Sequence, residues 1–289
     1  MTMSALVLTL IASNLTNILA KEFLGYIPAW LTAVKVVLLL AAALHYRRTA
    51  SRPLAAFAFA LCGVIGFSYL AAMLARTAQW QALFDPATFA GHFGSAIYNK
   101  AASTLPVIVL LVCLHKSPQE ALLGLGDLSV KAAPIRWLGV KPDWITWRRL
   151  SLFSAFAIAG GTLLLTLLTT TGFSVPHTIS GLPRQLPTIT LLALVNSISE
   201  GFLFRNAVLA PLRRALPKEH LLLIAALFFG LAHFYGVPAG VIGVIMSGVL
   251  GWYLARSMYE TGGLLAPWII HFLQDFVIFT TLFLLGTFV

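Results

Sequence analysis

The chain contains an uninterrupted apolar stretch at residues 54–74, LAAFAFALCGVIGFSYLAAML, without a single charged side chain. A helix of about 20 such residues is long enough to cross the hydrocarbon core of a bilayer. Similar stretches lie on both sides of it, and together they give nine candidate spans, at residues 5–20, 29–45, 54–74, 88–114, 150–171, 187–215, 220–235, 238–256 and 263–286. The pattern predicts an all-α, polytopic transmembrane helix bundle of about 8–9 spans.

The composition of the whole chain favours the same class. Of 289 residues, 59% are hydrophobic and 10% are charged, and the mean hydropathy is +0.91, whereas soluble domains carry about 25% charged residues. These values exclude a soluble enzyme and a disordered chain. The net charge of +10 is not gathered into a dense basic block, so the expected partner is the lipid bilayer and not a nucleic acid.

The lysine and arginine residues predict the orientation of a multi-pass protein of the cell membrane. If the N-terminus is cytoplasmic, fourteen of them fall in cytoplasmic loops and three in the opposite loops, a strong positive-inside bias. The fourteen are Arg47, Arg48, Arg52, Lys116, Lys131, Arg136, Lys141, Arg148, Arg149, Arg205, Arg213, Arg214, Lys218 and Arg256, and the three are Lys21, Arg76 and Arg184. Lys35 and Lys100 fall inside apolar segments, where we interpret them as reaching to the headgroups; the alternative is a residue on an ion pathway.

The longest polar stretch, residues 115–149, divides the chain into N-terminal transmembrane helices at 1–114 and a C-terminal core at 150–289. It carries three tryptophans beside its basic residues, Trp137, Trp144 and Trp147. Tryptophan is enriched at headgroup depth, and basic side chains favour an anionic leaflet. The stretch is therefore predicted to be an interfacial cytoplasmic loop.

Acidic and imidazole side chains inside the predicted spans are concentrated in the C-terminal half, as Glu200, His233, His271 and Asp275. Because such groups are costly in lipid, each is a candidate functional residue. Glu200 and His233 lie equally far from a hairpin tip near residue 217, so antiparallel helices would place them at similar depth. His271 and Asp275 share one helix face and could reach the same layer. The four residues predict one polar site, although a lone histidine would as readily be a helix-to-helix hydrogen-bond partner.

Three neighbouring residues leave alternatives open. Asn196 and Ser197 share a face with Glu200, and we interpret this pair as small residues at a helix contact. Arg205 is five residues beyond Glu200 and rotated by about 140° on an ideal helix. A direct ion pair would therefore need a bulge or a kink, which Pro211 could supply.

In order and spacing, three motifs resemble those of the CAAX protease and bacteriocin-processing family of intramembrane endopeptidases, in particular the CAAX prenyl endopeptidases. The family motifs read EExxxR, FxxxH and HxxxN/D, and this chain has EGFLFR at 200–205, FGLAH at 229–233 and HFLQD at 271–275. The similarity covers roughly residues 185–280. One position departs from the pattern, because the second glutamate is Gly201 here, and this leaves the charge partner of Arg205 open.

The resemblance implies an endopeptidase that hydrolyses peptide bonds in membrane-associated protein or peptide tails. It makes Glu200, His233, His271, Asp275 and Arg205 the candidate catalytic residues. Glu200 and His233 would activate water, while His271 with Asp275 would stabilise the oxyanion. No cofactor-binding residue is indicated. The favoured mechanism uses no metal, and the alternative is a catalytic zinc held by two imidazoles and a carboxylate.

The sequence is also consistent with two other classes of membrane protein. A non-catalytic membrane interaction or immunity protein of the same fold would be consistent with the loss of a glutamate at Gly201. A proton-coupled transporter would use buried Glu, His and Asp residues as a relay, but it predicts repeat symmetry between the two halves, which the sequence does not show. The sequence indicates neither recognition of a prenyl group nor an oligomeric state.

Overall fold

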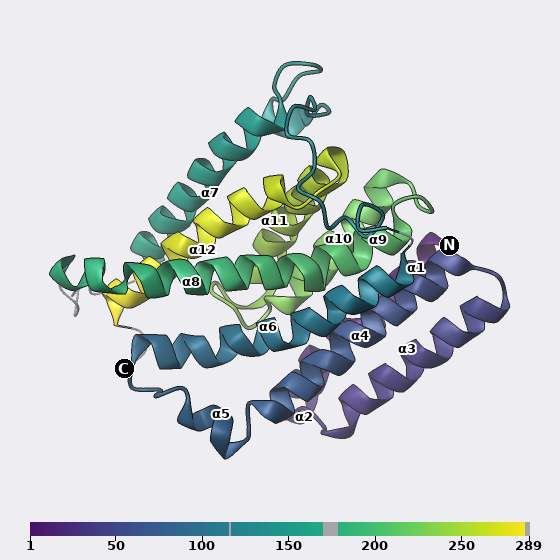
Figure 1. The fold of residues 1–289 in the computed structure, drawn as a ribbon, viewed down its shortest axis with the longest axis horizontal. Coiled ribbons are helices and arrows are strands. Elements are labelled where there is room, and N and C mark those ends of the chain that lie inside the picture. The colour runs from purple at the N-terminus through teal and green to yellow at the C-terminus, as the bar shows by residue number, and fades with distance from the viewer. Residues whose placement is uncertain (116, 170–178, 287–289) are drawn as a thin grey trace.

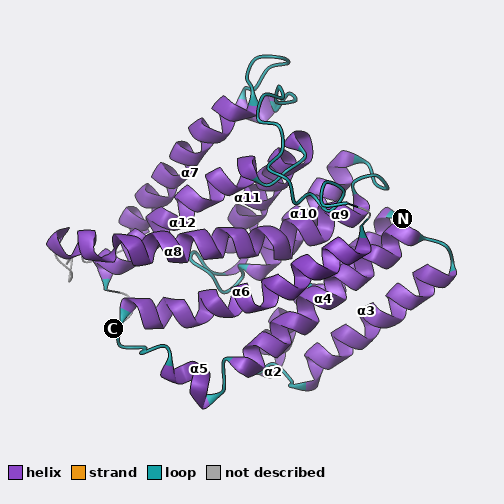
Figure 2. Ribbon diagram, viewed as in Figure 1, coloured by secondary structure: helices purple, strands orange, loops and turns teal. Residues whose placement is uncertain are grey.

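The computed structural model describes residues 1–115, 117–169 and 179–286, which are almost entirely helical (Figures 1 and 2). The helices are α1 (Thr2–Ala12), α2 (Leu15–Leu24), α3 (Trp30–Arg48), α4 (Arg52–Leu74), α5 (Ala78–Ala82), α6 (Phe89–Leu114), α7 (Trp147–Thr169), α8 (Leu182–Glu200), the π-helical segment η3 (Gly201–Asn206), α9 (Ala207–Leu212), α10 (Lys218–Ala232), α11 (Gly240–Thr261) and α12 (Leu265–Leu285), with short 3-10 turns at η1 (Arg136–Leu138) and η2 (Ile179–Gly181). In this described part, the β structure is limited to isolated bridges. The all-α prediction is confirmed.

Seven helical segments in the described residues are long and apolar enough to cross a membrane. They are α3, α4, α6, α7, the continuous segment from η2 to α9, α11 and α12, and the pair α1 and α2, bent by 48°, would make an eighth span. The protein is thus an integral membrane protein built as a polytopic helical bundle. The predicted span at 220–235 is wrong as a full crossing, because α10 has 15 residues and reaches about 22 Å, less than the hydrocarbon thickness of about 30 Å.

The bend between α1 and α2 explains a buried lysine. Lys35 on α3 donates from Nζ to the carbonyl oxygen of Ser13, at 2.8 Å, and to Oδ1 of Asn17, at 3.0 Å. A break in a helix leaves carbonyl groups without their intrahelical partners, and a lysine side chain can satisfy them. The interpretation that Lys35 reaches to the headgroups is therefore wrong, since its ammonium group is used inside the protein.

The packing of the helices places α6, α8 and α12 around a polar interior. α3 packs on α4, α4 on α6, α6 on α8, and α8 on α12, with α7 beside α12 and α10 beside α11 (Figure 1). α8 lies between α6 and α12, so it carries one face toward the N-terminal helices and one toward the C-terminal pair. The candidate site forms along this contact.

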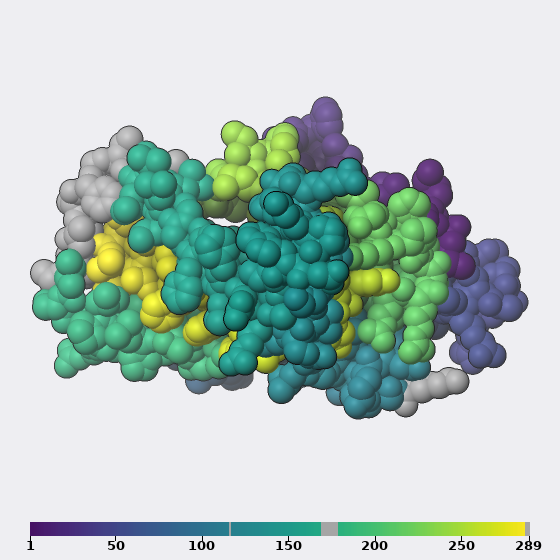
Figure 3. Space-filling view, turned by 90° about the horizontal axis from the view of Figure 1, so that it is seen from above, coloured from purple at the N-terminus to yellow at the C-terminus, as the bar shows by residue number. Residues whose placement is uncertain are grey.

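The segment between α6 and α7 folds over the ends of the C-terminal helices. Its backbone bonds to the turn that joins α11 and α12, where Leu264 and Leu265 donate to the carbonyl oxygens of Gly124 and Leu125 at 2.9 and 3.1 Å. Gly126 has φ +82°, and a Cβ there would lie 2.8 Å from backbone atoms of that turn, so a side chain cannot be accommodated. The view from above shows this teal segment across the centre of the molecule (Figure 3).

A buried carboxylate on α11 fastens this segment to the bundle. Glu260 forms ion pairs with Lys218, at 2.5 Å, and with Arg256, at 2.9 Å. Its Oε2 also accepts hydrogen bonds from the indole N–H of Trp147, at 2.8 Å, and the backbone N–H of Ala133, at 2.9 Å. One carboxylate therefore joins α10, α11, the start of α7 and the loop.

The three tryptophans of the loop segment consequently have different environments. Trp137 and Trp144 are each 63% exposed, as expected for side chains at headgroup depth. Trp147 is fully buried, since its N–H is used by Glu260. The prediction of an interfacial position is therefore wrong for Trp147.

Candidate functional site: a buried network of carboxylates, an imidazole and a lysine

Three of the predicted site residues meet between α8 and α12. Nε2 of His271 lies 3.4 Å from Oε2 of Glu200 and 3.6 Å from Oδ1 of Asp275. All three side chains are buried. Glu200 ends α8, while His271 and Asp275 are one helical turn apart on α12 and so face the same way. The convergence predicted for these three residues is present in the fold.

A lysine from the N-terminal helices completes this group. Nζ of Lys100, on α6, lies 2.6 Å from Oε1 of Glu200 and 2.7 Å from Oδ1 of Asn196. The Lys100 side chain is 38% exposed and that of Glu200 is 6% exposed, so the lysine links a buried carboxylate to the more open face of α6. The interpretation of Lys100 as reaching to the headgroups is wrong. Its only signal in the sequence was a charge within an apolar segment.

Asn196 connects the lysine to the second carboxylate. Its Oδ1 accepts from Lys100, and its Nδ2 donates to Oδ2 of Asp275 at 3.0 Å. The contact with Lys100 fixes the orientation of the amide, because an ammonium can only donate, so Oδ1 must accept and Nδ2 is left to donate to Asp275. Asn196 is one helical turn before Glu200, so the interpretation as a small residue at a helix contact is wrong for it. Ser197 does not join the network; its hydroxyl donates to the backbone of Leu194.

Arg205 fixes the protonation of the His271 ring. Its Nη2 lies 3.4 Å from Nδ1 of His271. A guanidinium can only donate, so Nδ1 must accept, and the neutral ring then carries its proton on Nε2. The protonated Nε2 is the ring nitrogen nearest to Glu200 and Asp275, at 3.4 and 3.6 Å.

His233 is near this network without joining it directly. It follows the end of α10, and its Nδ1 lies 2.8 Å from the carbonyl oxygen of Phe229. Nδ1 must therefore donate, which leaves the lone pair of the neutral ring on Nε2. The Phe229 ring is 4.4 Å from the His233 ring and 5.9 Å from the His271 ring, centroid to centroid. Within the described residues no ion pair joins His233 to Glu200 within 4.0 Å.

The segment that carries Arg205 is π-helical. Residues five apart lie on one side of such a turn, and η3 begins directly after Glu200. The expected bulge is therefore present, but at η3 and not at Pro211, which lies inside the short helix α9. Arg205 is 2% exposed, so counting it among the loop cations was wrong. Among the described side chains it makes no ion pair with Glu200 within 4.0 Å, since His271 stands between them.

Gly201 lies beside the Arg205 guanidinium. A Cβ at position 201 would be 3.0 Å from Nη2 of Arg205. A glutamate at this position, as in the family pattern, would have its carboxylate next to that cation. With glycine at this position, the Arg205 guanidinium lies close to the helix backbone, and a side chain at 201 would require it to shift.

The donor atoms do not fit a zinc site in this arrangement. The described residues contain no group of three or more His, Cys, Asp and Glu side chains placed to hold a metal ion. Lys100 bonds to Oε1 of Glu200, and Nε2 of His271 carries a proton instead of a free lone pair.

Together the fold and the site define a polytopic helical membrane protein with a buried carboxylate, imidazole and amine network at the contact of three helices. Residues 182–277, which are 96 of the 289, match the family model described as type II CAAX prenyl endopeptidase Rce1-like. This match confirms the resemblance that the three motifs carry in the C-terminal part of the chain. Lys100 lies outside the matched segment. No curated protein and no solved structure matches the chain.

Proposed function

We propose that the protein is an intramembrane endopeptidase of the cell membrane, with a cytoplasmic N-terminus, that hydrolyses peptide bonds in membrane-associated protein or peptide tails. The observation that carries this proposal is the buried carboxylate of Glu200, a residue of the segment that matches a peptidase family. It lies beside the His271 imidazole and the ammonium group of Lys100. Peptide hydrolysis needs a base for water, a donor for the oxyanion and an acid for the leaving amine.

Glu200 is the proposed general base. Lys100 occupies Oε1, which leaves Oε2 to accept a proton from water. Nε2 of His233 has a free lone pair and is the second proposed acceptor for that water. The oxygen of the water bonds to the carbonyl carbon of the scissile peptide while its proton passes to Glu200. Lys100 is a positioning residue here, since it acts by keeping the Glu200 carboxylate ionised and oriented.

His271 is the proposed donor to the oxyanion. The N–H at Nε2 would turn from the carboxylates to the oxygen that gains negative charge in the tetrahedral intermediate. Arg205 keeps the proton on this nitrogen, and Asp275, itself held by Asn196, lies beside the ring before the substrate binds. When the carbon–nitrogen bond breaks, the proton held by Glu200 passes to the leaving nitrogen, and the carboxylate is restored.

A comparison of protein C-termini tests the function. Membranes are prepared from cells that carry the intact chain or the Glu200→Ala variant, and C-terminal peptides are quantified by mass spectrometry. We expect at least one membrane protein to have a shortened tail only with the intact chain. Glu219→Ala, a matched change at an exposed glutamate on the first turn of α10, should give the intact pattern. Identical termini for the intact and Glu200→Ala chains, at equal expression, would contradict the proposal.

Metal removal is a separate prediction. The proposed base is a carboxylate, so cleavage of a substrate identified in this way should be retained, within about twofold, after dialysis against a strong chelator. Zinc-dependent hydrolysis would instead be lost and then restored by added zinc. Loss with restoration by zinc would replace the metal-free mechanism.

A non-catalytic interaction protein is a second candidate, and Gly201 is the observation that favours it, because Arg205 lacks the neighbouring glutamate of the family pattern. A binding role predicts that Glu200→Ala and His233→Ala leave partner association intact. Co-purification of a partner with both variants, combined with unchanged protein C-termini, would favour this class.

A further inference from the structure

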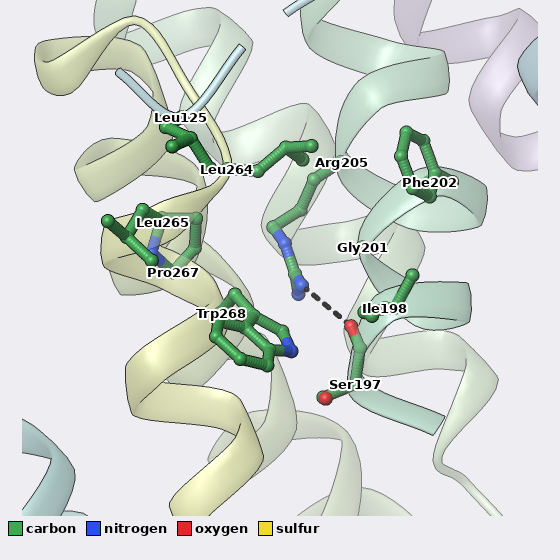
Figure 4. Close-up of a pocket in the computed structure, with 10 residues that line it drawn as sticks. All are labelled: Leu125, Ser197, Ile198, Gly201, Phe202, Arg205, Leu264, Leu265, Pro267 and Trp268. Carbon is green, nitrogen blue, oxygen red and sulfur yellow. Dashed lines mark hydrogen bonds between the residues drawn. The ribbon is translucent and has the colours of Figure 1, made fainter. Parts of the chain in front are cut away.

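A cavity of about 280 Å³ is lined in part by Arg205, and Glu200 is not among its lining residues. Its walls come from α8, η3, the first turns of α12 and the loop at Leu125, and they are almost entirely apolar (Figure 4). Ile198, Phe202 and Trp268 are among the lining residues, and Gly201 and Arg205 form part of the wall nearest the network. The volume is nearly twice that of a cavity of about 150 Å³ that admits benzene.

Two of the residues that line this cavity, Arg205 and Trp268, carry buried hydrogen-bond donors without partners. Nε and Nη1 of Arg205, and Nε1 of Trp268, have no hydrogen-bond partner among the described residues. Figure 4 shows the guanidinium and the indole nitrogen turned toward the same region between α12 and α8, with only the bond from Arg205 to the Ser197 carbonyl drawn there. Buried donors are normally satisfied, and those of a charged group are the most costly to leave unpaired.

The sequence explains why two of the three guanidinium nitrogens lack partners. At position 201 the family pattern has a glutamate, and the glycine here removes the carboxylate that would lie beside Arg205. Only 2% of the Arg205 surface is exposed, so the cation is buried. The cavity therefore has an apolar body and one uncompensated positive end.

We propose that this cavity binds a carboxylate carried on an apolar group, which takes the place of the missing glutamate side chain. The carboxylate accepts from Arg205 and from the Trp268 N–H, and the apolar group lies along Ile198 and Phe202. Planar guanidinium and carboxylate groups pair through two parallel hydrogen bonds. Because Arg205 also contacts Nδ1 of His271, the ligand is connected to the network by a single side chain.

The open side of the cavity indicates the depth from which the ligand enters. Leu125 is 68% exposed and Ile198 is 39% exposed, and both belong to the lining. Leu125 is part of the loop that is predicted to lie at headgroup depth. A single-chain fatty acid and the C-terminal residue of a peptide both present a carboxylate on an apolar group at that depth, and separate arms of the experiment distinguish these two sources.

Binding is measured by calorimetry on the full-length chain in dodecyl maltoside micelles. The lipid arm compares octanoate with octanamide, and the peptide arm compares N-acetyl-leucine with N-acetyl-leucinamide. In at least one arm the acid should bind at least about tenfold more tightly than its amide, since a hydrogen bond to a charged group is stronger than a neutral one. The arm with the larger preference identifies the source. Equal binding of acid and amide in both arms, or no binding, overturns the proposal.

Variants at Gly201 test the position of the ligand while Arg205 itself is kept, and the Gln variant controls for the shift of the guanidinium that any side chain at 201 requires. Gly201→Glu supplies a carboxylate in the same place and should weaken binding of the acid by at least about tenfold. Gly201→Gln is the matched neutral control, so the thermal midpoint of the unliganded protein should be higher for Gly201→Glu than for Gly201→Gln. Trp268→Phe keeps the ring but removes one donor, and it should weaken binding by about 2- to 10-fold. Unchanged binding of the acid by Gly201→Glu overturns the proposal.

Binding of the acid at this cavity does not depend on peptide hydrolysis. Glu200→Gln leaves the cavity lining unchanged and should bind the same acid within about twofold of the intact chain. Loss of acid binding in Glu200→Gln, with its thermal midpoint preserved, would place the ligand at Glu200 and overturn the assignment to this cavity.

Discussion

The Glu200→Gln substitution is expected to lower kcat for peptide hydrolysis by about 10²–10⁴-fold, with little change in KM. The amide has nearly the same size and can still accept a hydrogen bond, but it cannot take a proton from water. General base catalysis contributes about this much to an enzymatic rate. The measurement is the steady-state rate of the purified chain on a tail identified by the comparison of C-termini.

Lys100→Met should cause a loss of the same kind, of about 10²–10³-fold in kcat, because an unpaired carboxylate is costly to keep ionised away from water. If Lys100 acts through Glu200, the double variant should be no slower than Glu200→Gln alone, since residues that act as a unit are not additive. Additive losses in kcat would show that Lys100 acts elsewhere in the reaction.

The controls for this pair come from the same chain. Lys35→Met removes another buried lysine that bonds to the N-terminal helices, so it reports the effect of losing a buried amine on folding alone. Glu219→Gln makes the conservative carboxylate change at an exposed position. Both should retain kcat within about threefold. A Glu200→Gln chain that folds and cleaves at the intact rate would contradict the assignment of Glu200 as the base.

Glu260→Ala is expected to reduce the free energy of unfolding by about 3–5 kcal/mol, the cost of removing one partner from a buried ion pair. Glu260 and Arg256 are both buried, and the change would leave Arg256, Lys218 and the Trp147 N–H without their acceptor. The measurement is equilibrium unfolding in mixed micelles with an increasing fraction of a denaturing detergent.

The loop gives a second readout for Glu260. Because the Ala133 backbone N–H bonds to this carboxylate, limited proteolysis within residues 117–146 should be faster in Glu260→Ala than in the intact chain. Glu219→Ala, at an exposed helix start, should change the unfolding free energy by at most about 1 kcal/mol and leave the loop cleavage unchanged. A stability loss below about 1 kcal/mol for Glu260→Ala would mean that this cluster does not hold the loop.

Several structural features could be predicted from local sequence alone. Long apolar stretches such as residues 54–74 must form helices in lipid, because each backbone polar group needs a partner within its own segment. The pairing of His271 with Asp275 also follows from a local rule, since residues four apart share a helix face. The prediction of a full membrane span at 220–235 was wrong, because the apolar character of this stretch does not show that its helix has only 15 residues.

The site was predicted only in part. Glu200, His271 and Asp275 were found because acidic and imidazole groups are conspicuous in apolar segments. Lys100 and Asn196 were not assigned to the site, because a long lysine side chain has a ready alternative at the headgroups and an asparagine has one at a helix contact. Which alternative applies depends on the neighbouring helix.

The sequence by itself determined that the chain is a helical membrane protein with a motif-bearing C-terminal half, because hydropathy and spacing along one helix are local properties. Only the tertiary structure decided that Lys100 meets Glu200, that Arg205 contacts His271 and faces an apolar cavity, and that Trp147 is buried against Glu260. Each of these contacts joins separate helices or a helix and a loop, and depends on helix rotation and on the π-helical turn at 201–206. Those quantities are set by side-chain packing between segments distant in the chain.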